Sequence, residues 1–379
     1  MSAALLLAAA LALPQDAAPV GCRACKQRGV SDCPDHEDEW REAERGVRCT
    51  VAAACAKCGG ALVLDCPKCE GGPESAGADA RRADLAAWLA ERLPVEEALG
   101  RTVMRVEAQH VHLAAEIRTL KDGTKRVTGH QFLHALARDA ERAAGMIAEH
   151  YAIVREKDYK APMRLWFWQD RDTHLKVMRE HMKISGSGDV KIVGRKPSFS
   201  VWTADQAFGD GYVMLLTLGV HNMVHMLQSN VWDEIWIGDQ GAGWFDGGAA
   251  NWYEEKIYAR ARHYCIDEAA SVPNWENGVW RAAIRALLAK REAAIFPELM
   301  RKQTGEMTPE EHALSWSVYD WLVAEHPAAL TPLLQALKAR KPAREALPES
   351  AGLGIIDAER AWRGWVEKTY PARDKKPRE

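Results

Sequence analysis

The sequence predicts an α+β protein with strands in its first half and helices in its second, preceded by a small cysteine-rich module. Three observations lead to this fold class. Eight of the nine cysteines lie between residues 22 and 69. Strand and helix patterns alternate from about residue 85, and after Trp244 nearly every segment has helical periodicity. The 379 residues are enough for one large domain or two medium ones.

The N-terminus predicts export. An apolar run from Ala3 to Leu13 is too short to cross a bilayer, and small residues close it. Residues 1–15 are therefore predicted to be a signal peptide that directs the chain to the periplasm or the extracellular space, although no Lys or Arg precedes the run. A plain apolar N-terminus is the alternative.

The charge balance excludes two classes of partner. The formal net charge is −3 and both signs are mixed along the chain, so we expect neither nucleic-acid binding nor a polybasic membrane patch. No later segment is apolar over the length that a bilayer requires, so we expect no integral membrane span.

The cysteine-rich module, residues 20–72, contains one spacing twice: Cys-x2-Cys, seven residues, and a second close pair. The first unit consists of Cys22, Cys25, Cys33 and His36, and the second of Cys55, Cys58, Cys66 and Cys69. Four soft ligands in two close pairs suit tetrahedral Zn²⁺, so each unit predicts one structural zinc ion. Disulfides are the alternative in an exported chain, but His36 can replace a cysteine only at a metal. Cys49 falls outside the pattern and is left unassigned.

The phrases CAKCGG and CPKCEGG resemble the cysteine-rich region of J-domain chaperones. The resemblance covers only these knuckles and implies a zinc-ribbon-like module that binds a partner. The small, polar and charged residues 73–84 are predicted to form the linker to a large domain, residues 85–370. A charged tail, residues 371–379, ends the chain.

The elements of the large domain follow from apolar periodicity. Helical spacing covers 85–93 and 130–151, and residues 106–120 alternate as a strand that ends in the turn Lys121–Asp122–Gly123. The apolar run 163–170 predicts a buried strand, 171–182 a helix, 197–203 a strand and 212–228 a helix. Five further helices are predicted at 248–264, 277–293, 309–325, 328–340 and 357–369. Residues 341–356 are predicted to be a loop.

The helix predicted at 212–228 carries His221 and His225 on one face. This spacing alone is a weak signal, because chance gives roughly 0.4 such pairs in a chain with 13 histidines among 379 residues. The sequence contains its own control in His130 and His134, which have the same spacing and no supporting context.

The region around the second pair resembles the gluzincin-type peptidase-like domains of exported bacterial proteins. In that family, H-E-x-x-H is followed by a W-L-x-E-G-x-A-x-Y helix that supplies the third zinc ligand, and here GWFDGGAANWYEEK (243–256) follows HNMVH. The segments 314–323 and 361–366 resemble the family's C-terminal helices. The resemblance covers most of residues 100–370 and implies a zincin-like fold.

The sequence departs from the family's pattern at the two positions that are essential for zinc hydrolysis. Asn222 stands where the family has its general-base glutamate, and Gly247 stands where it has the third ligand. Asn222 cannot take a proton from water, and Gly247 offers no ligand atom. His221 and His225, with Asp246 as the nearest substitute ligand, are therefore predicted to be a vestigial metal site. Glu254 lies on the same helix face as Gly247 but roughly 10 Å along the axis, which is too far for a substitute ligand. Glu234 is a further carboxylate that could complete a modified zinc site, and Cys265 is interpreted as a core residue at a helix end.

Aromatic residues surround the lost site: Trp232, Trp236, Trp244, Trp252 and Tyr253. A cleft that they line is predicted to bind an extended peptide or a glycan without cleaving it. Packing in the core between helices is the alternative.

These observations predict an exported zinc-knuckle protein whose large domain is an inactive gluzincin-like peptidase domain, a pseudoenzyme that works as a binding or assembly module for a protein, peptide or glycan. Two alternatives stay open. One is a zinc metallopeptidase with an atypical third ligand and an altered base. The other is a partner-binding zinc-ribbon module on an inert platform.

Overall fold

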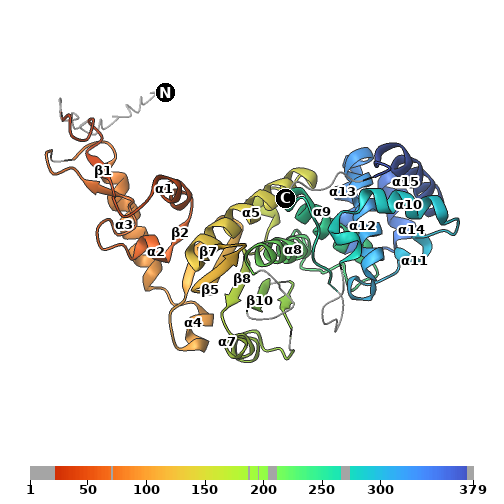
Figure 1. Ribbon diagram of the computed structural model, residues 1–379, viewed down its shortest axis with the longest axis horizontal. Helices are drawn as coiled ribbons and strands as arrows, with labels where there is room; N and C mark the ends of the chain where they lie inside the picture. The colour runs from red at the N-terminus through yellow and green to blue at the C-terminus, as the bar shows by residue number, and fades with distance from the viewer. Residues whose placement is uncertain are drawn as a thin grey trace, which may run out of the picture. The chain divides into compact units, whose positions relative to one another are not determined.

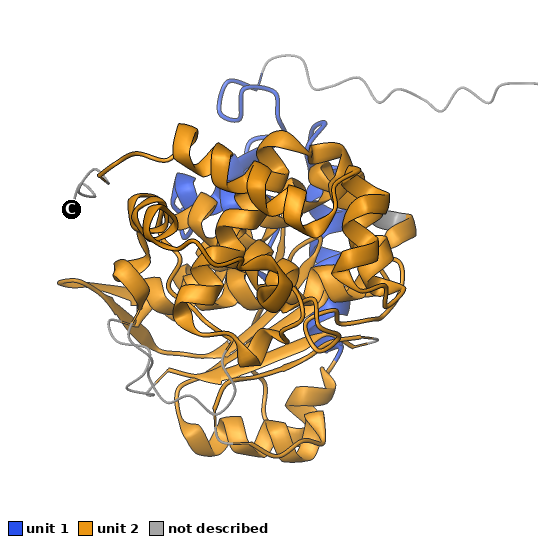
Figure 2. Cartoon of the chain, turned by 90° about the vertical axis from the view of Figure 1, so that its right-hand side faces the viewer, with its two compact units in different colours: residues 1–45, 50–91 blue, residues 46–49, 92–379 orange. Residues whose placement is uncertain are grey.

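A computed structural model describes residues 22–373, apart from 70, 187, 195, 204–210 and 266–273. The chain divides into two compact units (Figure 2): residues 1–45 with 50–91, and residues 46–49 with 92–379. We call them the cysteine-rich unit and the large unit. The signal peptide predicted for residues 1–15 and most of the predicted tail lie outside the described residues.

The cysteine-rich unit is built on a two-stranded antiparallel sheet of β1 (Val30–Asp32) and β3 (Val63–Asp65), with three helices, α1 (Asp38–Arg45), α2 (Thr50–Ala53) and α3 (Ser75–Ala90). Its apolar interior is small: one cluster consists of Val30, Ala61, Val63 and Ala78, and Leu62, Leu85 and Trp88 are buried as well. A core of this size contributes little folding energy, so the unit depends on other bonds between its segments.

The linker prediction for residues 73–84 is wrong, because residues 75–84 form the first part of α3. Its arginines hydrogen-bond the turns of the cysteine knuckles: Arg81 Nε donates to the Gly60 carbonyl at 2.8 Å, and Arg82 Nε to the Cys58 carbonyl at 3.3 Å. The polar composition that resembled a linker is thus the side of a helix that docks on backbone carbonyls. The boundary between the units falls between residues 91 and 92.

The large unit contains a six-stranded mixed sheet in the order β2-β4-β5-β8-β10-β9. Its strands are β2 (Arg48–Cys49), β4 (Met104–Glu107), β5 (Val111–Glu116), β8 (Met163–Trp168), β10 (Ser198–Trp202) and β9 (Val190–Ile192). Only the β5–β8 and β8–β10 pairs are parallel. The single strand predicted at 106–120 is wrong, because β4 and β5 are separate strands and β6 (Thr119–Asp122) pairs with β7 (Lys125–Thr128) in a hairpin.

The helices of the large unit come mostly late in the chain (Figure 1), as predicted. Those before residue 200 are α4 (Pro94–Leu99), α5 (Gly129–His150), α6 (Arg155–Asp158), α7 (Arg171–Val177) and a π-turn (Met178–Met182). After them come α8 (Tyr212–Asn230), α9 (Gly243–Tyr258), α10 (Arg281–Lys290), α11 (Phe296–Leu299), α12 (Pro309–Glu325), α13 (Leu330–Lys338), α14 (Ala343–Ala351) and α15 (Ile355–Thr369). The α+β class is confirmed, whereas the loop predicted at 341–356 contains α14.

Helix α8 lies in the middle of the large unit and is buried from Leu215 to Asn230. Gly219 lets it approach its neighbours, since a Cβ there would lie 2.7 Å from the Leu136 side chain of α5 and 3.3 Å from Phe167 of β8. On its other side α8 contacts α9. Because α8 is enclosed in this way, the polar side chains that it carries must find partners inside the protein.

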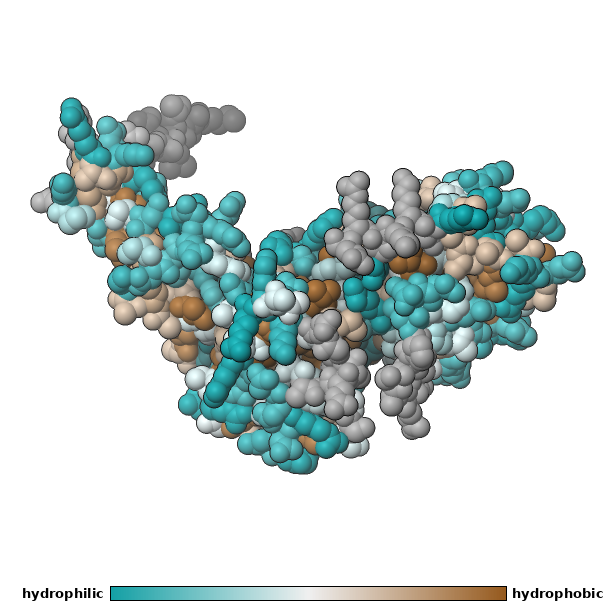
Figure 3. Space-filling model, in the orientation of Figure 1, coloured by the Kyte–Doolittle hydropathy of each residue, from teal (hydrophilic) through white to brown (hydrophobic). Residues whose placement is uncertain are grey.

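Apolar residues are largely withdrawn from the surface. On the face drawn in Figure 3 the described residues are mainly hydrophilic, and brown residues are scattered between them. The large apolar side chains exposed in the described part of the chain are Val51, Leu89, Val154 and Ile356. None of the helices in that part is both long and apolar enough to cross a membrane.

Candidate functional site

The eight predicted knuckle ligands gather into two groups in the cysteine-rich unit, but not the two groups that the spacing predicted. One group is Cys22, Cys25, Cys66 and Cys69, and the other is Cys33, His36, Cys55 and Cys58. The same eight residues are therefore brought together as groups that could hold a metal ion, while their assignment to two sequential units is wrong. The first close pair joins the fourth, and the second joins the third.

The antiparallel pairing of β1 with β3 explains this exchange. Val30 pairs with Asp65 and Asp32 pairs with Val63, so the chain before β1 lies beside the chain after β3. Gly29 and Gly72 bring the two outer turns together, because a Cβ on Gly29, whose φ is +80°, would lie 2.0 Å from the Gly72 nitrogen. A larger residue at position 29 would push the outer pairs of cysteines apart.

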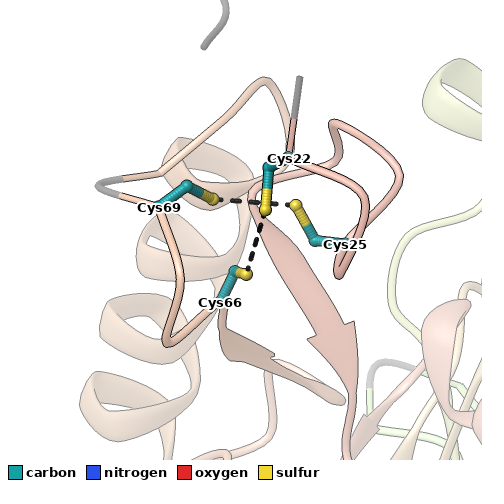
Figure 4. A group of neighbouring side chains, drawn as sticks. All are labelled: Cys22, Cys25, Cys66 and Cys69. Carbon is teal, nitrogen blue, oxygen red and sulfur yellow. Dashed lines mark hydrogen bonds between the residues drawn. The ribbon is translucent and has the colours of Figure 1, made fainter. Parts of the chain in front are cut away.

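The four-cysteine group has the spacing of a metal site (Figure 4). The Cys22 and Cys66 sulfurs are 3.8 Å apart and the Cys25 and Cys69 sulfurs 3.6 Å apart. Zn–S bonds of 2.3 Å in a tetrahedron place sulfurs about 3.8 Å apart, whereas a disulfide requires about 2.05 Å. All nine cysteines are free. The group can hold a metal ion, and the disulfide alternative does not fit.

The second group contains its histidine in the orientation of a ligand. His36 Nε2 is 3.3 Å from the Cys58 sulfur, while His36 Nδ1 lies 2.9 Å from Glu44 Oε2 on α1. A carboxylate behind a histidine fixes the tautomer and turns the other nitrogen toward a metal. Backbone N–H groups of Cys58 and Lys57 overcome the effect of burial and lower the pKa of Cys55 to about 7, which favours the thiolate that a metal requires.

A third group lies in the large unit and combines the histidine pair of α8 with a cysteine. His221 Nε2 and His225 Nε2 are 3.1 Å apart, and the Cys265 sulfur is 3.4 Å from the first and 3.3 Å from the second. Tetrahedral zinc with Zn–N bonds near 2.05 Å and a Zn–S bond of 2.3 Å requires about 3.3 Å between nitrogens and about 3.6 Å from nitrogen to sulfur. The three donors therefore fit one such ion, and within the part of the chain that the structure describes no fourth donor belongs to the group.

Glu254 of α9 supports both sides of this group, although it lies two turns along α9 from Gly247. Its Oε2 lies 3.0 Å from His221 Nδ1, and its Oε1 accepts from the Arg262 backbone N–H at 2.6 Å and lies 3.1 Å from His263 Nδ1. The carboxylate thus orients His221 and anchors the segment that leads to Cys265. Glu254 takes this part because α9 packs alongside α8, so distance along one helix does not measure distance to the next.

Asp246 lies behind the second histidine and is not a member of the donor group, so its predicted role as a substitute ligand is wrong. Its Oδ2 is 2.9 Å from His225 Nδ1, an ion-pair contact that is not aligned as a hydrogen bond. The same oxygen accepts from Trp236 Nε1 at 2.9 Å and from Thr304 Oγ1 at 2.8 Å. Both α8 histidines therefore have a buried carboxylate on the side away from the cysteine.

The charges of the group support one another. Burial disfavours the charged form of His221, but the Cys265 thiolate and the Glu254 carboxylate outweigh it and raise the pKa of His221 to about 9. Burial likewise opposes the Cys265 thiolate, and the positive charges of Lys191, His225 and His221 bring the pKa of Cys265 well below its usual value. The cysteine is therefore held in the form that binds metals.

Asn222, one residue after the first histidine of the pair, makes two hydrogen bonds inside the protein. Its Nδ2 donates to the Leu218 carbonyl at 3.0 Å, one turn earlier in α8. Its Oδ1 accepts from Lys191 Nζ at 3.3 Å, and the same ammonium lies 2.7 Å from the Cys265 sulfur. An ammonium thus stands beside the donor group, and Asn222 itself is held between Leu218 and Lys191.

The space left by the glycine at position 247 is occupied. A Cβ on Gly247 would lie 3.0 Å from Met307 Cε and 3.2 Å from His312 Nδ1. His312 of α12 is fully buried, and burial is the largest cause that lowers its pKa to about 3. A glutamate at position 247 would clash with the neutral imidazole, so His312 and Met307 fill the space beside Gly247.

The predicted aromatic cleft is wrong for three of its five residues. Trp244 and Tyr253 are fully buried and Trp252 is 4% exposed. Trp252 Nε1 donates to Asp320 Oδ1 at 2.7 Å, and the Tyr253 and Tyr319 hydroxyls are 3.2 Å apart. These side chains fill the contact between α9 and α12. The other two, Trp232 and Trp236, are half-buried, and the Trp236 indole holds Asp246 in place.

Cys265 is the member of this candidate metal group that the sequence alone does not identify, because its local pattern predicts a core residue. It follows α9 by seven residues and belongs to the irregular segment 259–265. Two signals were available: it is the one cysteine outside the N-terminal module, and His263 stands two residues before it. Glu234, also considered as a ligand, is exposed and does not belong to the group.

Comparison with known proteins adds no family assignment: no protein-family model matches the chain, and no curated protein matches it significantly. The geometry of the three groups therefore carries the functional argument.

Proposed function

We propose that the large unit is a zinc-dependent hydrolase whose ion is held by His221, His225 and Cys265. One observation carries the proposal: three soft donor atoms converge at tetrahedral spacing, with a buried carboxylate behind each histidine. Structural zinc sites use four protein ligands, whereas catalytic sites use three and keep a position for water. We further propose that the two four-residue groups of the cysteine-rich unit hold structural zinc ions.

The residues around the donor group have separable tasks. A zinc ion in such a site acts as a Lewis acid and lowers the pKa of a bound water to about 7. Glu254 and Asp246 hold the two imidazoles in the ligand orientation. Lys191 offers a fixed positive charge that can stabilise negative charge developing on a substrate oxygen. Asn222 cannot relay a proton to a leaving group, so we expect slow turnover.

Peptides are the substrate class that we propose. Lys191 belongs to β9, the last strand in the order of the sheet, which is paired on one side only among the described residues. An extended peptide can add to such an edge by backbone hydrogen bonds, which places its carbonyl groups next to side chains of the edge strand. The resemblance to gluzincin-type peptidases supports the same class.

A second function is favoured by one specific residue. Asn222 replaces the general base and bonds to Leu218 and Lys191, as a structural amide would. A centre of this kind can bind a peptide carbonyl or carboxylate at its open position and release it uncleaved. In that case the protein is a metal-dependent binding or assembly module, and the knuckles contribute a partner-binding surface of the kind that their chaperone resemblance implies. Export of the chain stays part of the proposal and is supported by the apolar run at residues 3–13.

The experiment compares zinc content and peptide hydrolysis in the full chain and in Cys265→Ser. We expect the variant to lose one zinc ion per chain and all hydrolysis of a peptide library. If Cys265→Ser loses the ion and the parent protein binds peptides without cleaving them, the second function is favoured. Equal zinc content in the two proteins would exclude both.

A further inference from the structure

Cys49, which has no place in the knuckle spacing, lies at the end of β2 near the start of α5. One donor atom each of Cys49, His130 and His134 lies within 4.8 Å of the other two. Cys49 is 1% exposed and His134 is 4% exposed, while His130 is half-buried. A thiol and two imidazoles that converge in the interior form a set of soft donors, the type that zinc prefers.

The start of α5 is built so that both histidines face the same way. Thr128 caps the helix, since its hydroxyl accepts from the Gln131 N–H at 3.2 Å and the Gln131 side chain accepts in return from the Thr128 N–H at 2.9 Å. Gly129 lets this end lie against the chain after β5, because a Cβ there would be 2.1 Å from the Ile117 carbonyl. The four-residue spacing then stacks His130 and His134 on one face.

Cys49 belongs to β2, a strand with few other contacts in the sheet. β2 is two residues long and pairs with β4 at two positions, Arg48 with Glu107 and Cys49 with Val106. It is the edge strand of the six-stranded sheet. The chain on either side of residues 46–49 belongs to the other compact unit. Two register positions give few backbone hydrogen bonds between β2 and β4. A bond from Cys49 to a metal would therefore add substantially to the stability of β2 in the sheet.

The arrangement repeats that of the α8 centre. The His130 and His134 ring centres are 4.7 Å apart with their planes at 84°, and those of His221 and His225 are 4.9 Å apart at 69°. In each case a histidine pair at helical spacing meets one cysteine from a segment distant in the sequence. His130 and His134 have no supporting residue near them in the sequence, but the fold places Cys49 beside them.

We propose that Cys49, His130 and His134 bind a zinc ion of their own, which ties the edge strand β2 to the first two turns of α5. The ion would be separate from those of the knuckles and of the α8 centre, because none of its three ligands belongs to those groups. The fourth position of the ion is left to a ligand other than these three residues.

The experiment measures zinc per chain in the zinc-saturated full-length protein after removal of free metal. Cys49→Ser and His134→Gln should each lose one zinc ion relative to the parent. The double variant Cys49→Ser/Cys265→Ser should lose two, because the sites are independent. His112→Gln is the matched control, since His112 lies on β5 of the same sheet and belongs to none of the metal-binding groups of the described residues. It should keep the parent's zinc content.

Parent zinc content in folded Cys49→Ser or in folded His134→Gln would overturn the proposal. If both variants fail to fold, ¹¹³Cd NMR of the cadmium-loaded parent decides, because one-thiolate sites resonate well apart from sites with three or four thiolates. Two signals of the one-thiolate type support the proposal, and a single one, lost in Cys265→Ser, overturns it. Overturning the zinc site of Cys49, His130 and His134 in this way would not affect the hydrolase proposed for His221, His225 and Cys265.

Discussion

Replacing Cys265 with serine is the sharpest test of the α8 centre. The substitution removes one of three donor atoms and changes the volume of the side chain little. His221, His225 and the carboxylates behind them keep their contacts, because Glu254 holds His221 and the Arg262 backbone independently of the thiol. Any change in zinc affinity can therefore be assigned to the lost thiolate.

The magnitude follows from the number of ligands. Four ligands hold zinc in small zinc-finger peptides with about 10–16 kcal/mol, which is about 2.5–4 kcal/mol for each ligand if they share equally. Losing one ligand of the three at this centre should therefore weaken binding roughly 100- to 1,000-fold, at 1.4 kcal/mol for each factor of ten. A serine hydroxyl is protonated at neutral pH and does not replace the thiolate.

The assay is zinc per chain across a series of buffers of fixed free-zinc concentration. In the parent protein, one equivalent should load in a step that moves to about 100- to 1,000-fold higher free zinc in Cys265→Ser, while the other steps stay in place. His326→Gln, a change in a histidine outside the metal-binding groups of the described residues, serves as the control and should leave every step unmoved. Superimposable curves for the parent and Cys265→Ser would refute the assignment of Cys265 as a ligand.

Three further predictions follow from the same structure. Asn222→Glu introduces a carboxylate where the proposed hydrolase lacks a base, so peptide hydrolysis should rise about 10²- to 10⁴-fold; unchanged rates in a zinc-loaded variant would count against hydrolysis at this centre. Glu254→Gln keeps the shape of the side chain but removes the charge behind His221, and zinc should bind about 10- to 100-fold more weakly in the buffer series; an effect as large as that of losing a ligand would contradict its supporting role. Burial raises the pKa of Glu141, but its hydrogen bonds with His110 outweigh this and hold the pKa below the ordinary 4.5. Because the unfolded carboxyl has the higher pKa, its contribution to stability is complete above pH 4.5 and is lost as the pH falls further. Unfolding by urea at several pH values should therefore show a flatter acid limb for Glu141→Gln than for the parent, and identical limbs would exclude this role.

Part of the candidate site could be predicted because it depends on local spacing. The helical periodicity that placed His221 and His225 on one face of α8 holds in the structure. The knuckle ligands were likewise predictable, because Cys-x2-Cys places two thiols on one turn wherever the chain goes. The same reasoning anticipated that Gly247 provides no ligand, although it could not show that His312 occupies the space.

The rest depended on contacts between segments distant in the sequence. Glu254 was judged by its distance along α9, whereas its partners lie on α8 and in the segment that follows α9. Residues 73–84 resemble a linker in composition and become helical where Arg81 and Arg82 reach the carbonyls of the knuckles. In both cases the hydrogen bonds join segments that are not related by helical or strand periodicity.

By itself, the sequence determined the types of candidate ligand, the close pairs in which they come and the presence of an amide at position 222, because these follow from residue identity and from the geometry of a single turn. The tertiary structure alone decided which pairs could share a metal ion, since the antiparallel register of β1 and β3 sets that choice. It alone brought Cys265 to the α8 histidines and Cys49 to the α5 histidines. A metal site needs donors within a few ångströms of one point, and only the packing of distant segments determines which donors reach it.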